Sequence, residues 1–286
     1  VYMKNSGNIT ILDCDFHETY RCIYFEEAWN ISINSTSFFN TSDCVYNHYS
    51  TKITELIIKN CSFYDSTGDG INIDYCTGFY IFDSFFEIDD EAMEFTYCED
   101  ILINNTSFDG CRTSIRMYKI DNIIISDSLF LNDDEDAIEL DELQSLKISN
   151  CNFTRTNWDA INLDSGTDIL INNIISIGRY DDGGISFNDI SRCEICHFEI
   201  DGEDAIFNIR NSNDLILKDG SIISRDWNNP GIWIQHSFDS RLINISVFSE
   251  ISQGVRIISS EDLIISKCSL ESVNSHGLYI ENSKGL

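Results

Sequence analysis

Two glutamates and one arginine recur at nearly equal spacing in the middle of the chain, at Glu94, Arg116 and Glu139. Two carboxyl groups on either side of a sugar bond can act as the acid and the nucleophile or base of glycoside hydrolysis. The arginine could bind the carboxylate of a uronic acid or stabilise an enolate that develops during its cleavage. The same residues could instead form a ladder of surface ion pairs, which adds little stability.

Acidic residues also gather just ahead of these positions, in runs at 89–91, 133–136 and 181–182. Such oxygen ligands suit Ca²⁺, which takes about six to eight of them. The residues expected to bind it are Asp134, Asp136, Asp141, Asp164 and Asp182. The alternative is a solvated acidic turn that follows from composition, since 48 Asp and Glu against 18 Lys and Arg leave a net charge of −30.

These side chains require a scaffold that brings residues about one repeat apart into contact. An apolar dyad of the form Ile-x-Ile returns every 21–27 residues from end to end, in two interleaved series of twelve. Apolar and polar residues alternate within each repeat, as at 159–164 and 168–173, which predicts strands. We therefore expect a single all-β domain over 1–286, a parallel β-helix of about twelve coils with three short strands each.

Coils of such a helix are spaced about 4.8 Å apart, so equivalent residues form columns. One internal column is predicted to contain Phe16, Phe38, Phe63, Phe86, Phe108, Phe130 and Phe153. Another internal position accepts Cys, Ser or Thr, which favours free buried thiols over disulfides for the 11 cysteines.

Outward positions between the two apolar residues of each first strand form a row that could contact substrate. The predicted row is Tyr24, Tyr46, Asn72, Glu94, Arg116, Glu139, Asn162, Ser186, Phe207, Trp233, Arg256 and Tyr279. Phe207 fits it poorly, and a bulge near Asn208 would shift the frame. The residues expected to bind substrate are Tyr24, Tyr46, Asn72, Asn162, Trp233, Arg256 and Tyr279.

The segments 69–73, 136–140 and 159–163, with asparagine pairs at 104–105 and 172–173, resemble the repeats of pectin-lyase-like proteins. The likeness covers essentially the whole chain. It implies a right-handed helix whose substrate groove follows the first strand of each coil, and Ca²⁺ that bridges protein carboxylates and anionic sugars. The superfold carries lyases, hydrolases, epimerases, tailspikes and non-catalytic surface proteins, so the fold leaves the activity open.

Several partners and cofactors are not expected. The acidic net charge disfavours nucleic acid, and no apolar run approaches the length of a membrane span. The segment 193–197 matches a c-type haem attachment string, but it falls in a strand with Cys193 and Ile195 inward, so neither haem nor a nucleotide is expected. The abrupt ends of the repeat favour a piece of a longer protein.

Two functions remain open. Nearly uniform coils without long loops favour an extracellular or cell-surface scaffold, adhesin-like, with an acidic calcium-binding face that contacts a polysaccharide or cell-surface glycan. The alternative is a polysaccharide-active enzyme, a uronate lyase, glycoside hydrolase or epimerase, centred on Glu94, Arg116 and Glu139.

Overall fold

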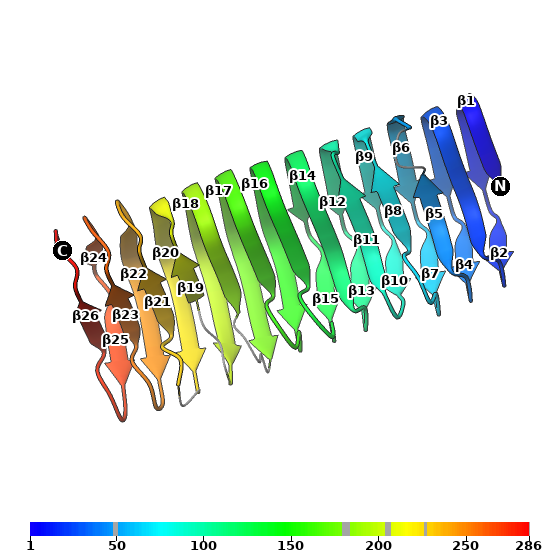
Figure 1. The fold of residues 1–286 in the computed structure, drawn as a ribbon. Helices are drawn as coiled ribbons and strands as arrows, with labels where there is room; N and C mark the ends of the chain where they lie inside the picture. The colour runs from blue at the N-terminus through cyan, green and yellow to red at the C-terminus, as the bar shows by residue number, and fades with distance from the viewer. Residues whose placement is uncertain (48–50, 179–183, 204–206, 226–227, 286) are drawn as a thin grey trace.

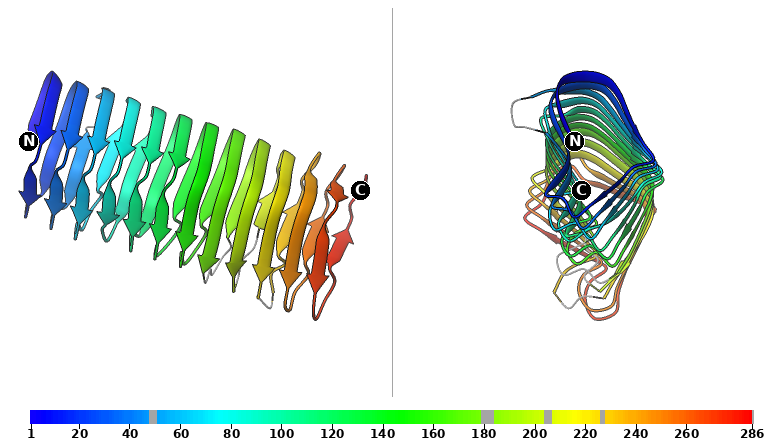
Figure 2. Two further views of the ribbon diagram at one scale, coloured as in Figure 1. Left: turned by 180° about the vertical axis from the view of Figure 1, so that it is seen from behind. Right: turned by 90° about the vertical axis from the view of Figure 1, so that its right-hand side faces the viewer.

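The computed structural model describes residues 1–47, 51–178, 184–203, 207–225 and 228–285, and their regular structure is β-strand throughout. The strands wind into a parallel β-solenoid of about 12 turns, as predicted, with the two ends of the chain at opposite ends of a rod (Figure 1). Viewed along the rod, successive coils follow a common outline (Figure 2). Within the described ranges, no helix has the length and apolarity needed to cross a membrane.

The described residues form 26 strands. Those of the first half are β1 (Tyr2–Leu12), β2 (Asp15–His17), β3 (Arg21–Asn34), β4 (Ser37–Phe39), β5 (Asp43–Asn47), β6 (Ile53–Lys59), β7 (Ser62–Tyr64), β8 (Ile71–Asp74), β9 (Cys76–Phe82), β10 (Phe85–Glu87), β11 (Glu91–Thr96), β12 (Glu99–Asn104), β13 (Ser107–Asp109), β14 (Thr113–Ser126) and β15 (Leu129–Leu131). Those of the second half are β16 (Ile138–Thr154), β17 (Ile161–Gly178), β18 (Ile185–Gly202), β19 (Phe207–Arg210), β20 (Asn213–Ser224), β21 (Ile232–Gln235), β22 (Arg241–Ser249), β23 (Val255–Ile258), β24 (Ile264–Ser266), β25 (Ser269–Ser272) and β26 (Leu278–Glu281).

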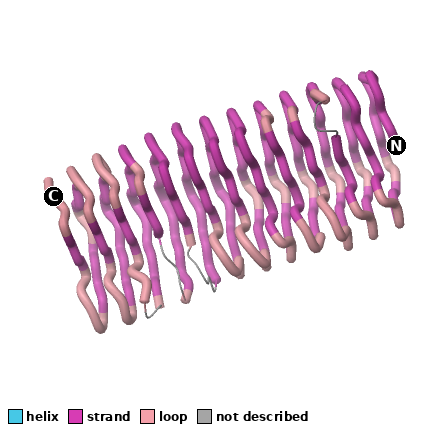
Figure 3. The backbone as a smooth tube through the Cα atoms, in the orientation of Figure 1, coloured by secondary structure: helices cyan, strands magenta, loops and turns pink. Residues whose placement is uncertain are grey.

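The bends between strands are made by residues with positive φ. Asn105 and Asn173, from the two asparagine pairs, have φ of 49° and 53°. Their side chains donate to Asp83 and Asn150 of the preceding coil at 2.7 and 2.9 Å, so the bends form hydrogen-bonded ladders. Asparagine tolerates this conformation better than most residues. Because backbone pairing continues around such bends, the short strands predicted for each coil merge into single long strands in β16, β17 and β18. Strand therefore covers most of each coil (Figure 3).

The interior contains the predicted columns. Rings of the seven-phenylalanine column stack face to face with centroids between 4.3 and 5.2 Å apart. All 11 cysteines are free, and nine of them are buried. Cys193 and Ile195 point inward, as expected for a strand of the repeat.

Parallel pairing confirms the repeat register through most of the chain, for example Ile138 with Ile161. It differs near the C-terminus. The apolar repeat in the sequence would align Leu215 with Leu242, at the longest spacing of 27 residues, but the structure aligns Leu217 with Leu242. Leu215 and Leu217 are both inward and buried, so alternation alone is compatible with either alignment.

Candidate functional site

The outward rows of the first strand in each coil form one continuous surface, which we call the first-strand face. It follows β3, β5, β8, β11, β14, the first strands of β16, β17 and β18, then β19, β21, β23 and β26. Tyr24 aligns with Tyr46, Glu94 with Asn72 and Arg116, and Glu139 with Asn162, as predicted.

The predicted row is wrong at one coil. Phe207 is buried, and Asn208 takes the outward position between Ser186 and Trp233. Ile209 is likewise buried and Arg210 points outward. A shift of one residue exchanges the two faces of a strand, and here it moves two large apolar side chains into the core.

Arg116 is the centre of an ion-pair network. Its Nε donates to Glu139 Oε2 at 2.7 Å, its Nη1 pairs with Glu91, and its Nη2 lies 3.6 Å from Glu135. Within the described part of the chain, no ion pair joins Arg116 to Glu94. Glu94 instead accepts a hydrogen bond from Asn72 Nδ2 at 2.6 Å. The structure thus joins two members of the predicted triad and separates the third.

Glu91 is the member that sequence reasoning missed. Only 5% of its side chain is exposed, and Arg112 and Arg116 both bind it. Burial by itself would raise the pKa of Glu91, but hydrogen bonds from Asp90 and Arg112 and the charges of both arginines lower it. Its place at the end of the acidic run 89–91, where β11 begins, was the available signal.

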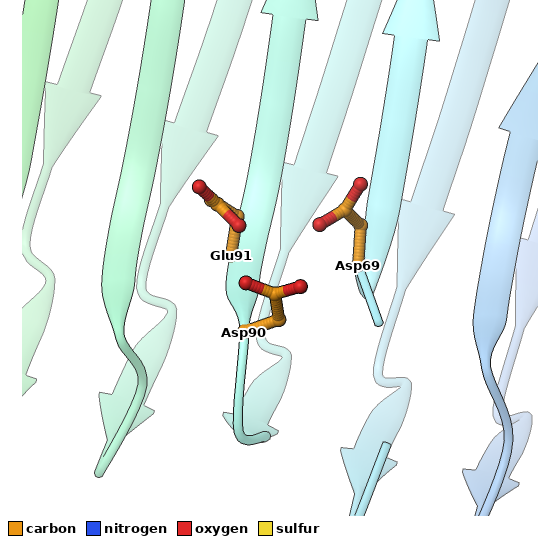
Figure 4. A group of neighbouring side chains, drawn as sticks. All are labelled: Asp69, Asp90 and Glu91. Carbon is orange, nitrogen blue, oxygen red and sulfur yellow. The ribbon is translucent and has the colours of Figure 1, made fainter. Parts of the chain in front are cut away.

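Asp69, Asp90 and Glu91 form a cluster in which carboxylate oxygens lie within 4.8 Å of one another (Figure 4). Burial raises the pKa of Asp69 to about 7, against the hydrogen bond from Asn72, and the charges of Glu94 and Glu91 raise it further. Burial and the adjacent Glu91 raise the pKa of Asp90 to about 6. Near neutral pH this cluster therefore combines protonated and ionised carboxyl groups.

The residues predicted to bind calcium lie two or more coils away from this cluster. Asp136 is buried and accepts hydrogen bonds from the Asp159 backbone at 2.8 Å and from Asn162 Nδ2 at 2.9 Å. Asp141 and Asp164 are partners in the ladder between β16 and β17, and burial together with Asp164 raises the pKa of Asp141. Asp134 is exposed, and Asp182 lies outside the described residues.

A divalent cation needs several carboxylate oxygens within reach of one point. In the described ranges, only Asp69, Asp90 and Glu91 bring three acidic or other metal-ligating groups within reach of a single ion. Arg112 already neutralises Asp90, at 2.6 Å, and shares Glu91 with Arg116. The cluster is therefore matched to guanidinium groups and protons, and it fits a calcium ion poorly.

Aromatic side chains occupy the N-terminal end of the first-strand face. Tyr2, Tyr24 and Tyr46 stack with centroids 5.4 and 5.6 Å apart. The Arg21 guanidinium lies 4.6 Å from the Tyr46 ring and 3.1 Å from Asp43. Since the rings cover each other's faces, the column presents ring edges and hydroxyl groups outward.

At the other end, Trp233 is placed between two arginines. Arg210 and Arg256 lie 5.5 and 5.3 Å from its ring, and Arg256 lies 5.7 Å from Tyr279. Trp233, Arg256 and Tyr279 are aligned along one row, and Arg210 aligns with Gln235 in the neighbouring row.

Solved structures with the same architecture include both adhesins and enzymes. The Streptococcus pneumoniae surface protein and adhesin PfbA matches with a TM-score of 0.67 and 12% identity, over 94% of this chain and 90% of that one. DFA-IIIase from Arthrobacter chlorophenolicus A6 without its lid matches with a TM-score of 0.64 and 10% identity, over 96% and 82%. The periplasmic alginate epimerase AlgG matches with 0.54 and 11%, over 93% and 78%.

At these identities the likeness establishes the fold alone. No curated protein matches the sequence. The right-handed β-helix region family matches residues 1–134 and 45–187, which together make up more than half of the chain. With parallel pairing of equivalent residues from coil to coil, the chain belongs to the right-handed β-helix family.

Proposed function

We propose that this chain is a glycan-contacting module of the cell surface or extracellular space, with the first-strand face as its contact surface. The observation that carries the proposal is that ion pairs and hydrogen bonds hold the charged side chains at the centre of that face. Arg116 is bound by Glu91 and Glu139, and Asn72 holds Glu94. Groups held in this way form a preorganised polar wall, which suits binding more than proton transfer.

Other features of the face support the same function. The tyrosine column supplies aromatic edges and hydroxyl groups, and Asn162 adds an amide in the same row. Carbohydrate hydroxyls are recognised by such polar groups beside apolar rings. The architectural likeness to a surface adhesin and to carbohydrate-active proteins is in keeping with a glycan partner and an extracellular location.

A binding assay tests the proposal. The chain would be titrated with a panel of neutral and acidic oligosaccharides, and we expect Tyr24→Ser to weaken the tightest complex about fivefold or more, the scale expected for loss of an aromatic contact. Tyr80→Ser, on β9 of a different side of the coil, is the matched control. Failure of every oligosaccharide to bind, or an equal effect of the two substitutions, contradicts the proposal.

A second function, polysaccharide cleavage, is favoured by one observation. Asp69 and Asp90 have raised pKa values beside an ionised Glu91, so a proton is available near neutral pH for the leaving-group oxygen of a sugar bond. Because Glu91 is buried against two arginines, the half-buried Asp69 and Asp90 are the carboxyl groups placed to reach a substrate.

The same oligosaccharide panel separates the two functions when product formation is measured. New reducing ends or unsaturated sugars that disappear in Asp69→Asn but persist in Tyr80→Ser would establish an enzyme centred on the carboxyl cluster. Loss in Glu139→Gln with full retention in Asp69→Asn would place the chemistry at Arg116 instead. Binding without any product supports the scaffold.

Calcium remains part of the proposal at Asp141 and Asp164, which are neighbours on adjacent coils. Calorimetric titration of the chain with CaCl₂ measures calcium binding directly. Binding that Asp164→Asn removes supports a calcium-bridged glycan contact, whereas absence of heat in both proteins contradicts it.

A further inference from the structure

The first-strand face changes sign along the rod. Its two outward rows between Asn72 and Asn188 contain one arginine, Arg116, and five acidic residues, namely Glu94, Glu139, Asp141, Asp164 and the buried Asp74. From Asn208 to Glu281 the same rows contain Arg210, Arg256 and a single acid, Glu281. In a chain with a net charge of −30, the C-terminal coils are therefore locally cationic on this face.

Among the described residues, neither Arg210 nor Arg256 forms an ion pair with an acidic side chain. No carboxylate of the described residues lies within 4 Å of Arg210 or Arg256, whereas Arg116, Arg192 and Arg225 each pair with at least one. Arg155 and Arg241 likewise have no carboxylate of the described residues within 4 Å, so what distinguishes Arg210 and Arg256 is the Trp233 ring that they share.

Aromatic rings, and not carboxylates, hold these guanidinium groups in place. Arg210 and Arg256 lie over the Trp233 ring at 5.5 and 5.3 Å, and Arg256 also lies over Tyr279. A cation over an aromatic face keeps its full charge. The aromatic contacts thus orient two planar cations without neutralising either, which prepares them for an anion that arrives from outside.

Unmatched polar atoms occur in the same row. Asn208 Oδ1, Trp233 Nε1 and Arg256 Nε are all buried and lack a hydrogen-bond partner among the described residues. These residues are in register on three successive coils. Buried polar atoms in folded proteins are almost always hydrogen-bonded, and three of the nine exceptions among the described side chains fall in this one row. Their gathering supports a ligand or its water at this row.

We infer that Arg210 and Arg256, held by Trp233 and Tyr279, form a subsite for the carboxylate of an acidic sugar. A guanidinium group matches a carboxylate with two parallel hydrogen bonds. Asn208 and Gln235 add amide groups beside the arginines for the sugar hydroxyls. This inference rests on the proposed glycan contact and specifies that the glycan is acidic. The anionic part of the glycan would bind at the C-terminal coils, because the acidic middle coils repel it.

The experiment compares a tetramer of galacturonic acid with its neutral methyl ester and with a sulfated tetramer of the same length. We expect the acid to bind about tenfold more tightly than the ester, which corresponds to about 1.4 kcal/mol. Arg210→Gln and Arg256→Gln should each remove most of that difference and leave ester binding within about twofold. Arg192→Gln, an arginine paired with Asp168 at 2.7 Å, is the matched control. Added salt should weaken binding of the acid only.

Each outcome bears on the inference. Equal binding of acid and ester, acid binding that both glutamine variants retain, or preference for the sulfated tetramer overturns a carboxylate subsite. Arg256→Lys, which keeps the charge but loses the planar fork, should retain part of the preference and shows that loss in Arg256→Gln is not caused by unfolding. If neutral oligosaccharides bind but no preference for the acid exists, the inference fails and the proposed function stands.

Discussion

At the scale of single residues, the ion pair between Arg116 and Glu91 joins a partly exposed side chain to a buried one. Glu91 is 5% exposed, whereas Arg116 is 31% and Glu139 38% exposed. Arg116→Gln removes one of the two guanidinium groups that bind the buried Glu91 carboxylate. We expect the unfolding free energy to fall by about 1–3 kcal/mol. This is less than the loss for breaking a fully buried ion pair, because Arg116 is partly solvated. Glu139→Gln should cost less than about 1 kcal/mol. Urea unfolding of both variants measures this, and equal losses would contradict the network described.

Asp69 predicts a specific dependence of stability on pH. Its pKa is raised from 3.8 to about 7, so between these values the folded chain binds more protons than the unfolded chain. Asp69 therefore contributes its full stabilisation of the folded chain below about pH 4, and this stabilisation is lost as pH rises through about 7. Asp69→Asn should flatten the decline in melting temperature between about pH 5 and 7.5, compared with the wild type. Parallel curves for the two proteins would show that Asp69 titrates normally.

At the scale of elements, the bends depend on residues that accept positive φ. Asn105 has φ of 49° and donates to Asp83. Asn105→Ala and Asn105→Gly both lose this hydrogen bond, but only alanine has a Cβ that disfavours the left-handed conformation, at about 1–2 kcal/mol. We therefore expect the alanine variant to be the less stable by about 1 kcal/mol in denaturant unfolding. A more stable alanine variant would mean that the bend changes conformation.

At the scale of the whole molecule, the rod concentrates a net charge of −30 on aligned columns. Acidic residues of successive coils lie one strand spacing apart, so their repulsion acts over a distance shorter than the Debye length at moderate salt. We expect 0.5 M NaCl to raise the melting temperature of the chain relative to 0.05 M NaCl, because screening relieves this repulsion. A melting temperature that falls with salt would show that ion pairs such as those of Arg116 dominate instead.

The sequence by itself determined the coil and its columns. Apolar and polar residues alternate within a repeat of about 22 residues. Where the apolar residues are unambiguous, as at Ile138 and Ile161, this alternation fixes which side chains of a strand point inward. It therefore predicted the phenylalanine stack, the alignment of Tyr24 with Tyr46 and the neighbourhood of Arg116 and Glu139. It was ambiguous where apolar residues fit two frames, at Phe207 and at Leu242.

Only the tertiary structure decided which charges meet. Spacing aligns Glu94, Arg116 and Glu139 equally well, yet Arg116 turns to Glu139 and to Glu91 at the start of β11, while Glu94 turns to Asn72. The same holds for Arg256, which lies over Trp233 and binds no carboxylate of the described residues. Register places backbones in a column, but the direction of a long side chain depends on rotamers, burial and competing partners from neighbouring coils, and these exist only once the coils are stacked.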